Sequence, residues 1–272
     1  SSEKKDMAMI YSEQPAVIAG TFTRNLVKAA PVLWDRKLVE EQEAIRAVVV
    51  NTGIANACTG TAGYENTQKE AILAADILGL QPEEIAIGST GVIGKQLPMD
   101  IIEKGIRTVA PQLNDSRQSS KDAAEAILTT DTKSKEAAVT VEIGGKEVTI
   151  GGICKGSGMI HPNMGTMLGY IATDAAIEKE LLLEMQRELV EDTFNMVSVD
   201  GDTSTNDTVL VMANGMAGNE TIRTKDADYQ AFREGLLYVN RALAMQIAAD
   251  GEGCTRLFEV HVAGADTKEN AK

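Results

Sequence analysis

Short apolar runs alternate with turn residues through the first fifty positions of the chain. The segments 7–12, 16–23 and 44–51 are rich in Val, Ile, Ala and Thr, which favours β-strands. Residues 67–79 then place apolar side chains at helical spacing and end at Gly79, a residue typical of a helix C-terminus. The opening third is therefore predicted to contain three strands followed by a helix.

Helical spacing of apolar residues returns four more times along the chain. A helix is predicted from Pro98 onward, and a second over residues 121–128, where Ser119 and Asp122 have the spacing of a capping box. The two longest predicted helices cover residues 175–194 and 225–249.

Strict alternation predicts further strands. Residues 137–153 form the clearest hairpin, with Gly144 and Gly145 at its turn. A polar loop within 198–215 leads into another strand, and residues 256–264 have the pattern of a last one. Strands and helices are thus mixed and hairpins are present, which indicates a layered α/β fold rather than a purely parallel sheet.

Composition narrows the possible functions. The 272 residues carry 26 Lys and Arg against 40 Asp and Glu, a formal net charge of −14 with no dense basic block, which disfavours nucleic acids and anionic membranes as partners. No apolar run approaches the ~20 residues of a membrane span. The first ten residues lack the pattern of a signal peptide, and three widely spaced cysteines favour a reducing compartment, so a cytoplasmic location is expected.

The chain contains only two histidines, His161 and His261. A three-histidine metal site is therefore impossible, and no metal site is expected. If the chain is an enzyme, its acid–base chemistry is expected to depend on groups other than imidazole.

Thr166 is the candidate nucleophile. It follows Gly165 at the start of an apolar strand, in a segment (155–174) that is dense in glycine. A backbone break before Thr166 would give it a free α-amine with a reference pKa of roughly 7.7–8.0, able to accept the hydroxyl proton without a histidine. The alternative is an ordinary loop between two strands, and composition alone does not separate the two.

Three other segments have both a functional and a structural interpretation. Residues 89–95 fail the phosphate-loop pattern, but they fit either a backbone oxyanion site or a tight strand-to-helix turn. Residues 200–207 fail the EF-hand pattern and fit a structural or substrate-facing loop. Asp250 and Glu252 follow a long helix and, taken alone, fit a solvated helix end.

Taken together, the motifs resemble one family. NTGIANACTG (51–60), STGVIG (89–94), TTDT (129–132), KGSGMIHPNMGTML (155–168), DGDTSTND (200–207) and DGEG (250–253) occur in the order found in the ornithine acetyltransferase family, also called glutamate N-acetyltransferase, of arginine biosynthesis. The resemblance covers nearly the whole chain. It implies a layered α/β sandwich shared with certain aminopeptidases.

The resemblance also implies a reaction. Members cut themselves before the nucleophile, here between Gly165 and Thr166, into pieces 1–165 and 166–272 that stay associated as a hetero-oligomer. Thr166 then carries an acetyl group from N-acetylornithine to glutamate; some members accept acetyl-CoA as donor, and no other cofactor is implied. Thr90 and Gly91 correspond to the oxyanion hole. Substrate contacts correspond to Thr129, Lys155, Thr166 and Glu252.

The sequence departs from the family pattern at three places. Gly165 stands where the family usually has Ala, and Thr52 and Ile54 replace a Ser and an Asn. The family's C-terminal segment has no counterpart in this sequence. Two alternatives therefore stay open: an aminopeptidase or amidase that uses water as acceptor, and a fragment that binds amino acids without turnover.

Overall fold

The computed structural model describes residues 5–161 and 167–271. Its helices and strands, in chain order, are β1 (Met7–Phe22), α1 (Ala30–Glu41), β2 (Ala44–Ile54), α2 (Gly60–Leu78), β3 (Ile85–Val92), α3 (Met99–Val109), α4 (Arg117–Ala126), β4 (Lys135–Ile143), β5 (Lys146–Lys155), β6 (Leu168–Thr173), α5 (Lys179–Glu191), β7 (Thr208–Ala213), α6 (Ala227–Ala249) and α7 (Lys268–Ala271). Short 3₁₀ helices lie at Pro82–Glu84, Ala110–Gln112 and Phe194–Met196.

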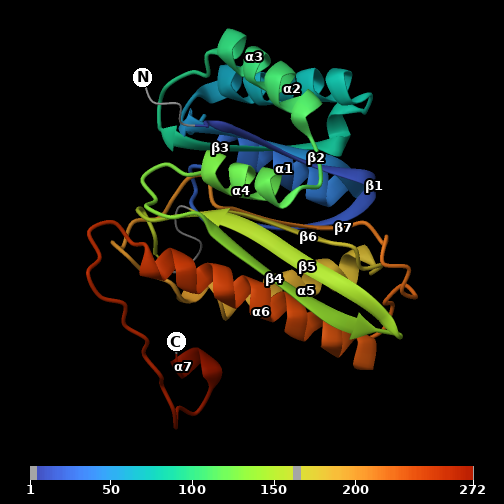
Figure 1. Cartoon of the computed structure of the whole chain (residues 1–272). Coiled ribbons are helices and arrows are strands. Elements are labelled where there is room, and N and C mark those ends of the chain that lie inside the picture. Colours follow the sequence, from blue (N-terminus) through green and yellow to red (C-terminus); the bar gives the residue numbers. More distant parts are fainter. Residues whose placement is uncertain (1–4, 162–166, 272) are drawn as a thin grey trace.

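The seven strands form one sheet in the order β3-β2-β1-β7-β6-β5-β4. The long strand β1 lies inside this order and pairs with β2 on one side and β7 on the other. Its residues before position 17 pair with β2, those after it pair with β7, and only Val17 pairs with both. The register shifts between Tyr11 and Ala16. This irregularity divides the sheet into a first half-sheet (β3, β2 and the start of β1) and a second half-sheet (the end of β1, β7, β6, β5 and β4), which Figure 1 shows stacked one above the other.

Alternation along β7 shows how the second half-sheet lies between two apolar layers. Leu210 and Met212 pack in the same core as the first half-sheet, whereas Val209 and Val211 pack in a second core with α5 and α6. Successive side chains of a strand point to opposite faces, so one face of the second half-sheet contacts the first half-sheet and the other contacts helices.

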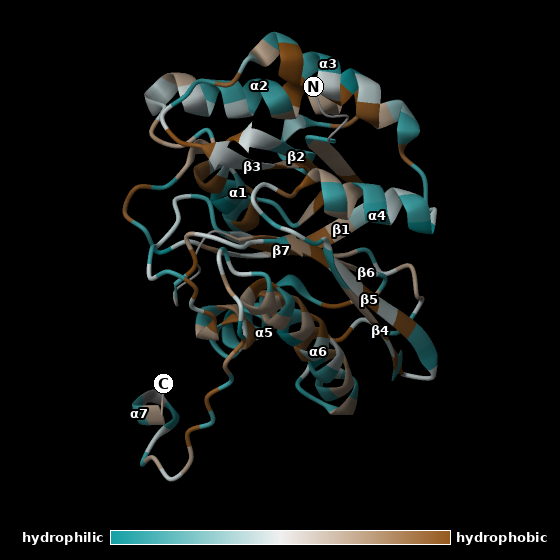
Figure 2. Cartoon of the chain, turned by 60° about the vertical axis from the view of Figure 1, so that its left-hand side comes forward, coloured by the Kyte–Doolittle hydropathy of each residue, from teal (hydrophilic) through white to brown (hydrophobic). Residues whose placement is uncertain are grey.

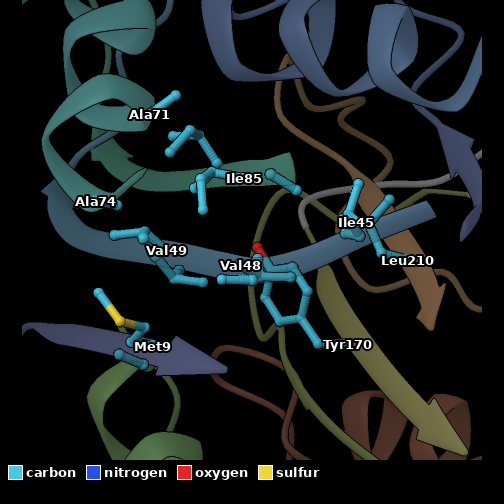
Figure 3. Close-up of a cluster of buried hydrophobic side chains, with 14 of the residues drawn as sticks. Met9, Ile45, Val48, Val49, Ala71, Ala74, Ile85, Tyr170 and Leu210 are labelled. Carbon is cyan, nitrogen blue, oxygen red and sulfur yellow. The ribbon is translucent and has the colours of Figure 1, made fainter. Parts of the chain in front are cut away.

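Tyr170 of β6 extends across the space between the half-sheets. Figure 3 shows its ring beside Val48 of β2, with Leu210 nearby. A Cβ placed on Gly88 of β3 would lie 2.0 Å from the Tyr170 hydroxyl oxygen. Gly88 therefore allows this close approach of the two half-sheets.

Strands β2 and β3 are buried on both faces. Both contain continuous runs of buried residues instead of alternation, which is the pattern of a strand covered on each side. Helices α2 and α3 contribute Ala71, Ala74, Ile102 and Ile106 to the core around these strands, and Figure 1 shows them as the outermost layer. The order helix, sheet, sheet, helix confirms the predicted layered α/β sandwich.

Helix α1 was not anticipated from the sequence, and it holds the edge strand β3. The Trp34 indole N–H donates to the Ile85 carbonyl (2.9 Å), and an Asp35 carboxylate oxygen accepts from the Ile87 N–H (2.8 Å). These bonds satisfy backbone groups that the β2 ladder does not use. Pro31 in the first turn of α1 is the sequence signal that could have identified this helix.

Several predicted element bounds were wrong. The segments 7–12 and 16–23 belong to one strand, β1, because the residues between them are also extended although the register with β2 shifts there. The helix predicted over 175–194 is α5 at Lys179–Glu191, and Ile177 instead forms a bridge with Ile222. Helix α4 is capped by the Ser116 hydroxyl, which accepts from the Ser119 N–H, so the expected capping box is absent there.

The strand predicted over residues 256–264 was also wrong. These residues adopt no regular structure and are exposed, with Phe258 at 84% and Val260 at 81%. Figure 2 shows this segment and α7 extending away from the sandwich. A strand requires a neighbour for its backbone hydrogen bonds, and none of the described strands pairs with these residues. No helix in the described ranges has the length and apolar character needed to cross a membrane.

Glu70 of α2 is a carboxyl group inside the sandwich. It is 1% exposed, and neither carboxyl oxygen has a hydrogen-bond partner among the described residues. Burial raises the pKa of Glu70 from 4.5 to about 8. The folded protein therefore retains this proton up to about pH 8, whereas the unfolded chain loses it near pH 4.5. The stabilising effect of the neutral form is complete below pH 4.5 and declines as the pH rises to 8.

We expect Glu70→Gln to stabilise the fold in a pH-dependent way. Gln stays neutral, so the gain in unfolding free energy relative to the native sequence should be about 2–4 kcal/mol larger at pH 8 than at pH 5. Urea unfolding at the two pH values measures this difference. Glu65→Gln, an exposed change on the same helix, is the control and should show no such dependence. Equal gains at both pH values would contradict the buried-acid assignment.

Candidate functional site

Thr90 and Gly91 lie at the end of β3, beside a bend in the neighbouring strand. Thr90 is buried, and the β2–β3 register is irregular at Gly53 and Ile54. Gly91 has φ 131°, and a Cβ there would lie 2.2 Å from the Gly53 carbonyl carbon. Only glycine fits this backbone contact, which explains the Thr-Gly pair of the 89–94 motif. Residues 89–92, which were predicted as part of a strand-to-helix turn, thus belong to the end of β3.

Asn206 connects three of the sequence motifs. Its side-chain amide donates to the Ala55 carbonyl (2.6 Å) and to the Ser89 carbonyl (2.8 Å). Asn51 adds a contact to the Ser89 hydroxyl (2.6 Å). The 51–60, 89–94 and 200–207 segments therefore meet where Asn206, in the loop before β7, contacts the end of β3. The position of Thr90 relative to β7 is fixed by these bonds.

The loop of residues 200–207 holds the chain on both sides of the candidate nucleophile. The Asp200 carboxylate accepts from the N–H groups of Met159 (2.5 Å) and Ile160 (3.0 Å). An oxygen of Asp207 accepts from the Met167 N–H (2.9 Å). Gly165 and Thr166 lie outside the described residues. The loop is structural in this sense, since its two carboxylates anchor the described positions on either side of residues 162–166.

Asp207 is a buried carboxyl group that sequence reasoning did not single out. Its second oxygen has no hydrogen-bond partner among the described residues. Burial raises the pKa of Asp207 well above its ordinary value, although the Met167 N–H, nearby hydroxyls and Lys155 act in the opposite direction. The sequence feature that could have identified Asp207 is its position directly before an apolar strand, at the end of the polar 200–207 motif.

Lys155 ends β5 next to the start of β6. It pairs in register with Leu168, two residues after Thr166, and its side chain is only 2% exposed. Its ammonium nitrogen lies 3.9 Å from an Asp131 oxygen and makes no hydrogen bond to a described residue. Burial lowers the pKa of Lys155, and Lys135 does so as well, while Asp131, Asp207 and Glu252 counteract them.

Asp131 and Lys135 form a buried ion pair that the sequence analysis missed. The Lys135 ammonium donates to Asp131 (2.7 Å) and to Asp250 (2.7 Å). Burial acts to raise the pKa of Asp131, but Lys155, Lys135 and the Gly156 N–H outweigh it and hold that pKa below its ordinary value. Asp250 is therefore not the solvated helix end that it resembles in isolation. The TTDT motif already contained Asp131.

Thr129 and Glu252 lie on two loops, and the ion pairs of Lys135 with Asp131 and Asp250 connect these loops. The Thr129 N–H donates to Asp131 (3.1 Å), and the Glu252 N–H donates to the Ser157 carbonyl (2.7 Å). The exposed Glu252 carboxylate lies against Gly158, where a Cβ would be 2.5 Å from its carboxyl carbon. Thr129 and Lys155 thus approach the same Asp131 oxygen, and the Glu252 charge acts on Lys155.

The described residues of the site include carboxylates and lysines, but they form no cluster suited to bind a metal ion. No group of three His, Cys, Asp or Glu side chains suited to a metal ion occurs in residues 5–161 and 167–271. A cavity of about 1900 Å³ lies elsewhere, between α3 and α4 and the strands β5 to β7. Its lining does not include Lys155, Asp207 or Glu252. The chemistry-bearing groups therefore lie outside that cavity.

Comparison with known proteins agrees with this arrangement of motifs. The ArgJ family model matches residues 1–272. This chain belongs to the ArgJ family. The Arginine biosynthesis bifunctional protein ArgJ of Symbiobacterium thermophilum is 54% identical over 269 residues, which cover 99% of this chain and 66% of that protein. The chain thus spans about two thirds of the length of the curated ArgJ proteins that it matches.

Solved ArgJ structures have the same fold. An ArgJ protein from Bacillus halodurans is 37% identical with a TM-score of 0.56, covering 61% of this chain and 85% of the solved one. Ornithine acetyltransferase from Mycobacterium tuberculosis, complexed with ornithine, is 34% identical with a TM-score of 0.52. This match covers 60% of this chain and 83% of the solved one. A Burkholderia β-aminopeptidase, 11% identical with a TM-score of 0.50 over 91% and 80%, shares the fold alone.

We expect Asn206→Asp to loosen the connection between the two half-sheets. The substitution removes both amide donors and leaves the Ala55 and Ser89 carbonyls without them, at about 1–3 kcal/mol for each buried group. The unfolding free energy from urea titration should fall by about 2–4 kcal/mol. Asn66→Ala, which removes an exposed amide bond to Gln96, should cost less than about 0.5 kcal/mol. Equal losses would show that Asn206 has no special role in this connection.

Proposed function

We propose that this chain acts as a glutamate N-acetyltransferase in which Thr166 is the nucleophile. Thr166 takes an acetyl group from N-acetylornithine and passes it to glutamate. The observation that carries the proposal is the Lys155 ammonium, which is buried and has no hydrogen bond to a described residue. It lies in register with Leu168, close to the Met167 N–H that Asp207 holds. A buried cation that makes no hydrogen bond to a described residue, next to the strand that follows the candidate nucleophile in the sequence, suits the α-carboxylate of an amino-acid substrate.

The chemistry requires a hydroxyl, a base and an oxyanion site. Cleavage of the Gly165–Thr166 bond frees the Thr166 amine, which accepts the hydroxyl proton as Oγ attacks the acetyl carbonyl. The ornithine nitrogen leaves with that proton, and the acetyl group stays on Oγ as an ester. The α-amine of glutamate then attacks the ester, and the hydroxyl is restored. Thr90 and Gly91 stabilise the oxyanion in both steps, an effect of about 3–4 kcal/mol for one such donor.

Charge at the site favours amino-acid substrates. Lys155 binds a carboxylate, and the exposed carboxylate of Glu252 on the neighbouring loop is available to the side-chain ammonium of ornithine. Thr129 lies on the loop that Asp131 holds. The ornithine bound by the Mycobacterium tuberculosis relative supports this substrate class. We propose that the reaction uses no cofactor and that acetyl-CoA is a candidate second acetyl donor. We also propose that the protein is located in the cytoplasm.

The two pieces would remain paired after cleavage. Strand β6 follows Thr166 and pairs with β5 of the first piece, and β7 pairs with β1. A break between Gly165 and Thr166 leaves both ladders intact, so a hetero-oligomer of pieces 1–165 and 166–272 is proposed. The solved relatives match 61% and 60% of this chain, about the length of the first piece.

We expect Thr166→Ala to abolish both self-cleavage and acetyl transfer, because one hydroxyl serves both reactions. Mass spectrometry of the native sequence should show pieces of 165 and 107 residues, and the variant a single chain. Transfer of labelled acetyl from N-acetylornithine to glutamate measures the second activity. Thr203→Ala, an exposed change in the 200–207 loop, is the control and should retain both.

Two results would contradict the proposal. Retained transfer in Thr166→Ala would remove Thr166 from the mechanism. Acetate release at the same rate with and without glutamate would instead indicate water as the acceptor.

A further inference from the structure

Four charged side chains are buried together beneath the proposed substrate site. The side chains of Lys135, Lys155 and Asp131 are 1%, 2% and 0% exposed, and that of Asp250 is 8% exposed. Two cations and two anions balance, so the cluster carries no net formal charge. A balanced cluster avoids the penalty of an unpaired buried charge. The contacts within it are nevertheless distributed unequally.

Both carboxylates are directed to Lys135 rather than to Lys155. The Lys135 ammonium lies 2.7 Å from Asp131 and 2.7 Å from Asp250, and it also donates to the Lys133 carbonyl (3.1 Å). Among the described residues, Lys155 has one ion-pair approach, the longer one of 3.9 Å to Asp131. One lysine is therefore fully coordinated, whereas the other keeps its N–H groups free of the cluster.

Backbone groups hold Asp131 in this orientation. The oxygen that contacts Lys135 also accepts from the Gly156 N–H (2.6 Å), and the other oxygen accepts from the Thr129 N–H (3.1 Å). Asp250 is held by the N–H and hydroxyl of Thr132. Each carboxylate thus has defined partners, and Lys135 is the cation that both share.

We propose that Lys135 is a positioning residue that keeps Lys155 open to the substrate carboxylate by engaging Asp131 and Asp250 itself. This inference rests on the proposed function, in which Lys155 binds that carboxylate. Without the Lys135 charge, Asp131 needs a movement of only about 1 Å to form a direct ion pair with Lys155, since such pairs form at about 2.8 Å. The substrate would then have to displace a buried carboxylate.

The first experiment measures the free amine of Lys155 directly. The groups that face it are Asp131, Lys135, Asp207 and Glu252. Trace labelling with propionic anhydride across a pH series, read by mass spectrometry, gives the midpoint at which Lys155 becomes reactive. Midpoints are compared, so a change in access alone does not affect the result. Exposed Lys95 is the internal reference.

We expect Lys135→Met to raise the Lys155 midpoint by at least about one pH unit, a tenfold loss of free amine at a given pH. The raised midpoint follows from the new ion pair with Asp131. Lys135→Met/Asp250→Asn removes one charge of each sign and keeps the cluster neutral, so it tests the same point if the single variant does not fold. An unchanged or lowered midpoint in a folded variant would overturn the proposal.

The second experiment separates positioning from general stability. For acetyl transfer, Lys135→Met should raise KM for N-acetylornithine about tenfold and leave kcat within about threefold. With the methyl ester of the donor, which has no carboxylate, the variant and the native sequence should have equal KM. A loss of kcat with unchanged KM would overturn the proposal. If the native sequence transfers no acetyl group, the proposed function fails, and the labelling result still decides whether Lys135 and Lys155 compete for Asp131.

Discussion

One strand that pairs with two different partners determines the arrangement of the whole molecule. The first residues of β1 pair with β2 and its last residues pair with β7, and Val17 alone pairs with both. The pairing of β1 with β2 shifts register between Tyr11 and Ala16, an irregularity of the kind that bends a strand. That bend places one half-sheet over the other. The apolar core, including Tyr170 from the opposite half-sheet, then fills the space between them.

The site depends on that stacking. Thr90 belongs to the first half-sheet, whereas Lys155 and Asp207 belong to the second or to the loop before its strand β7. Asn206 bonds to the Ser89 carbonyl next to Thr90, and Asp207 holds the Met167 N–H at the start of β6. Amide and carboxylate groups make these connections because both can satisfy backbone donors or acceptors inside a dry interface. The polar motifs of the chain are therefore structural as well as chemical, and one residue often serves both purposes.

Electrostatics at the site follow from burial in an acidic protein. The chain has a net charge of −14, yet two lysines are almost completely buried beside the proposed substrate site. Lys135 is neutralised by Asp131 and Asp250, while Lys155 retains charge that no described residue contacts closely. A cation of this kind attracts carboxylate ligands more strongly than a surface lysine would, because water does not screen it. Lys135, Asp131 and Asp250 together carry one net negative charge, which balances the charge of Lys155 at that depth.

The sequence by itself determined the elements with clear periodicity, the layered class of the fold and the motifs of the site, including Lys155, Glu252 and Thr129. The elements and the fold class follow from local spacing, whereas Lys155, Glu252 and Thr129 follow from the resemblance of their motifs to a known family. Tertiary structure decided the rest. The alternation at 256–264 indicated a strand, but pairing requires a neighbour that the described residues do not supply. The Lys135 ion pair joins positions more than a hundred residues apart, and one-dimensional spacing contains no measure of that distance or of burial, on which its strength depends.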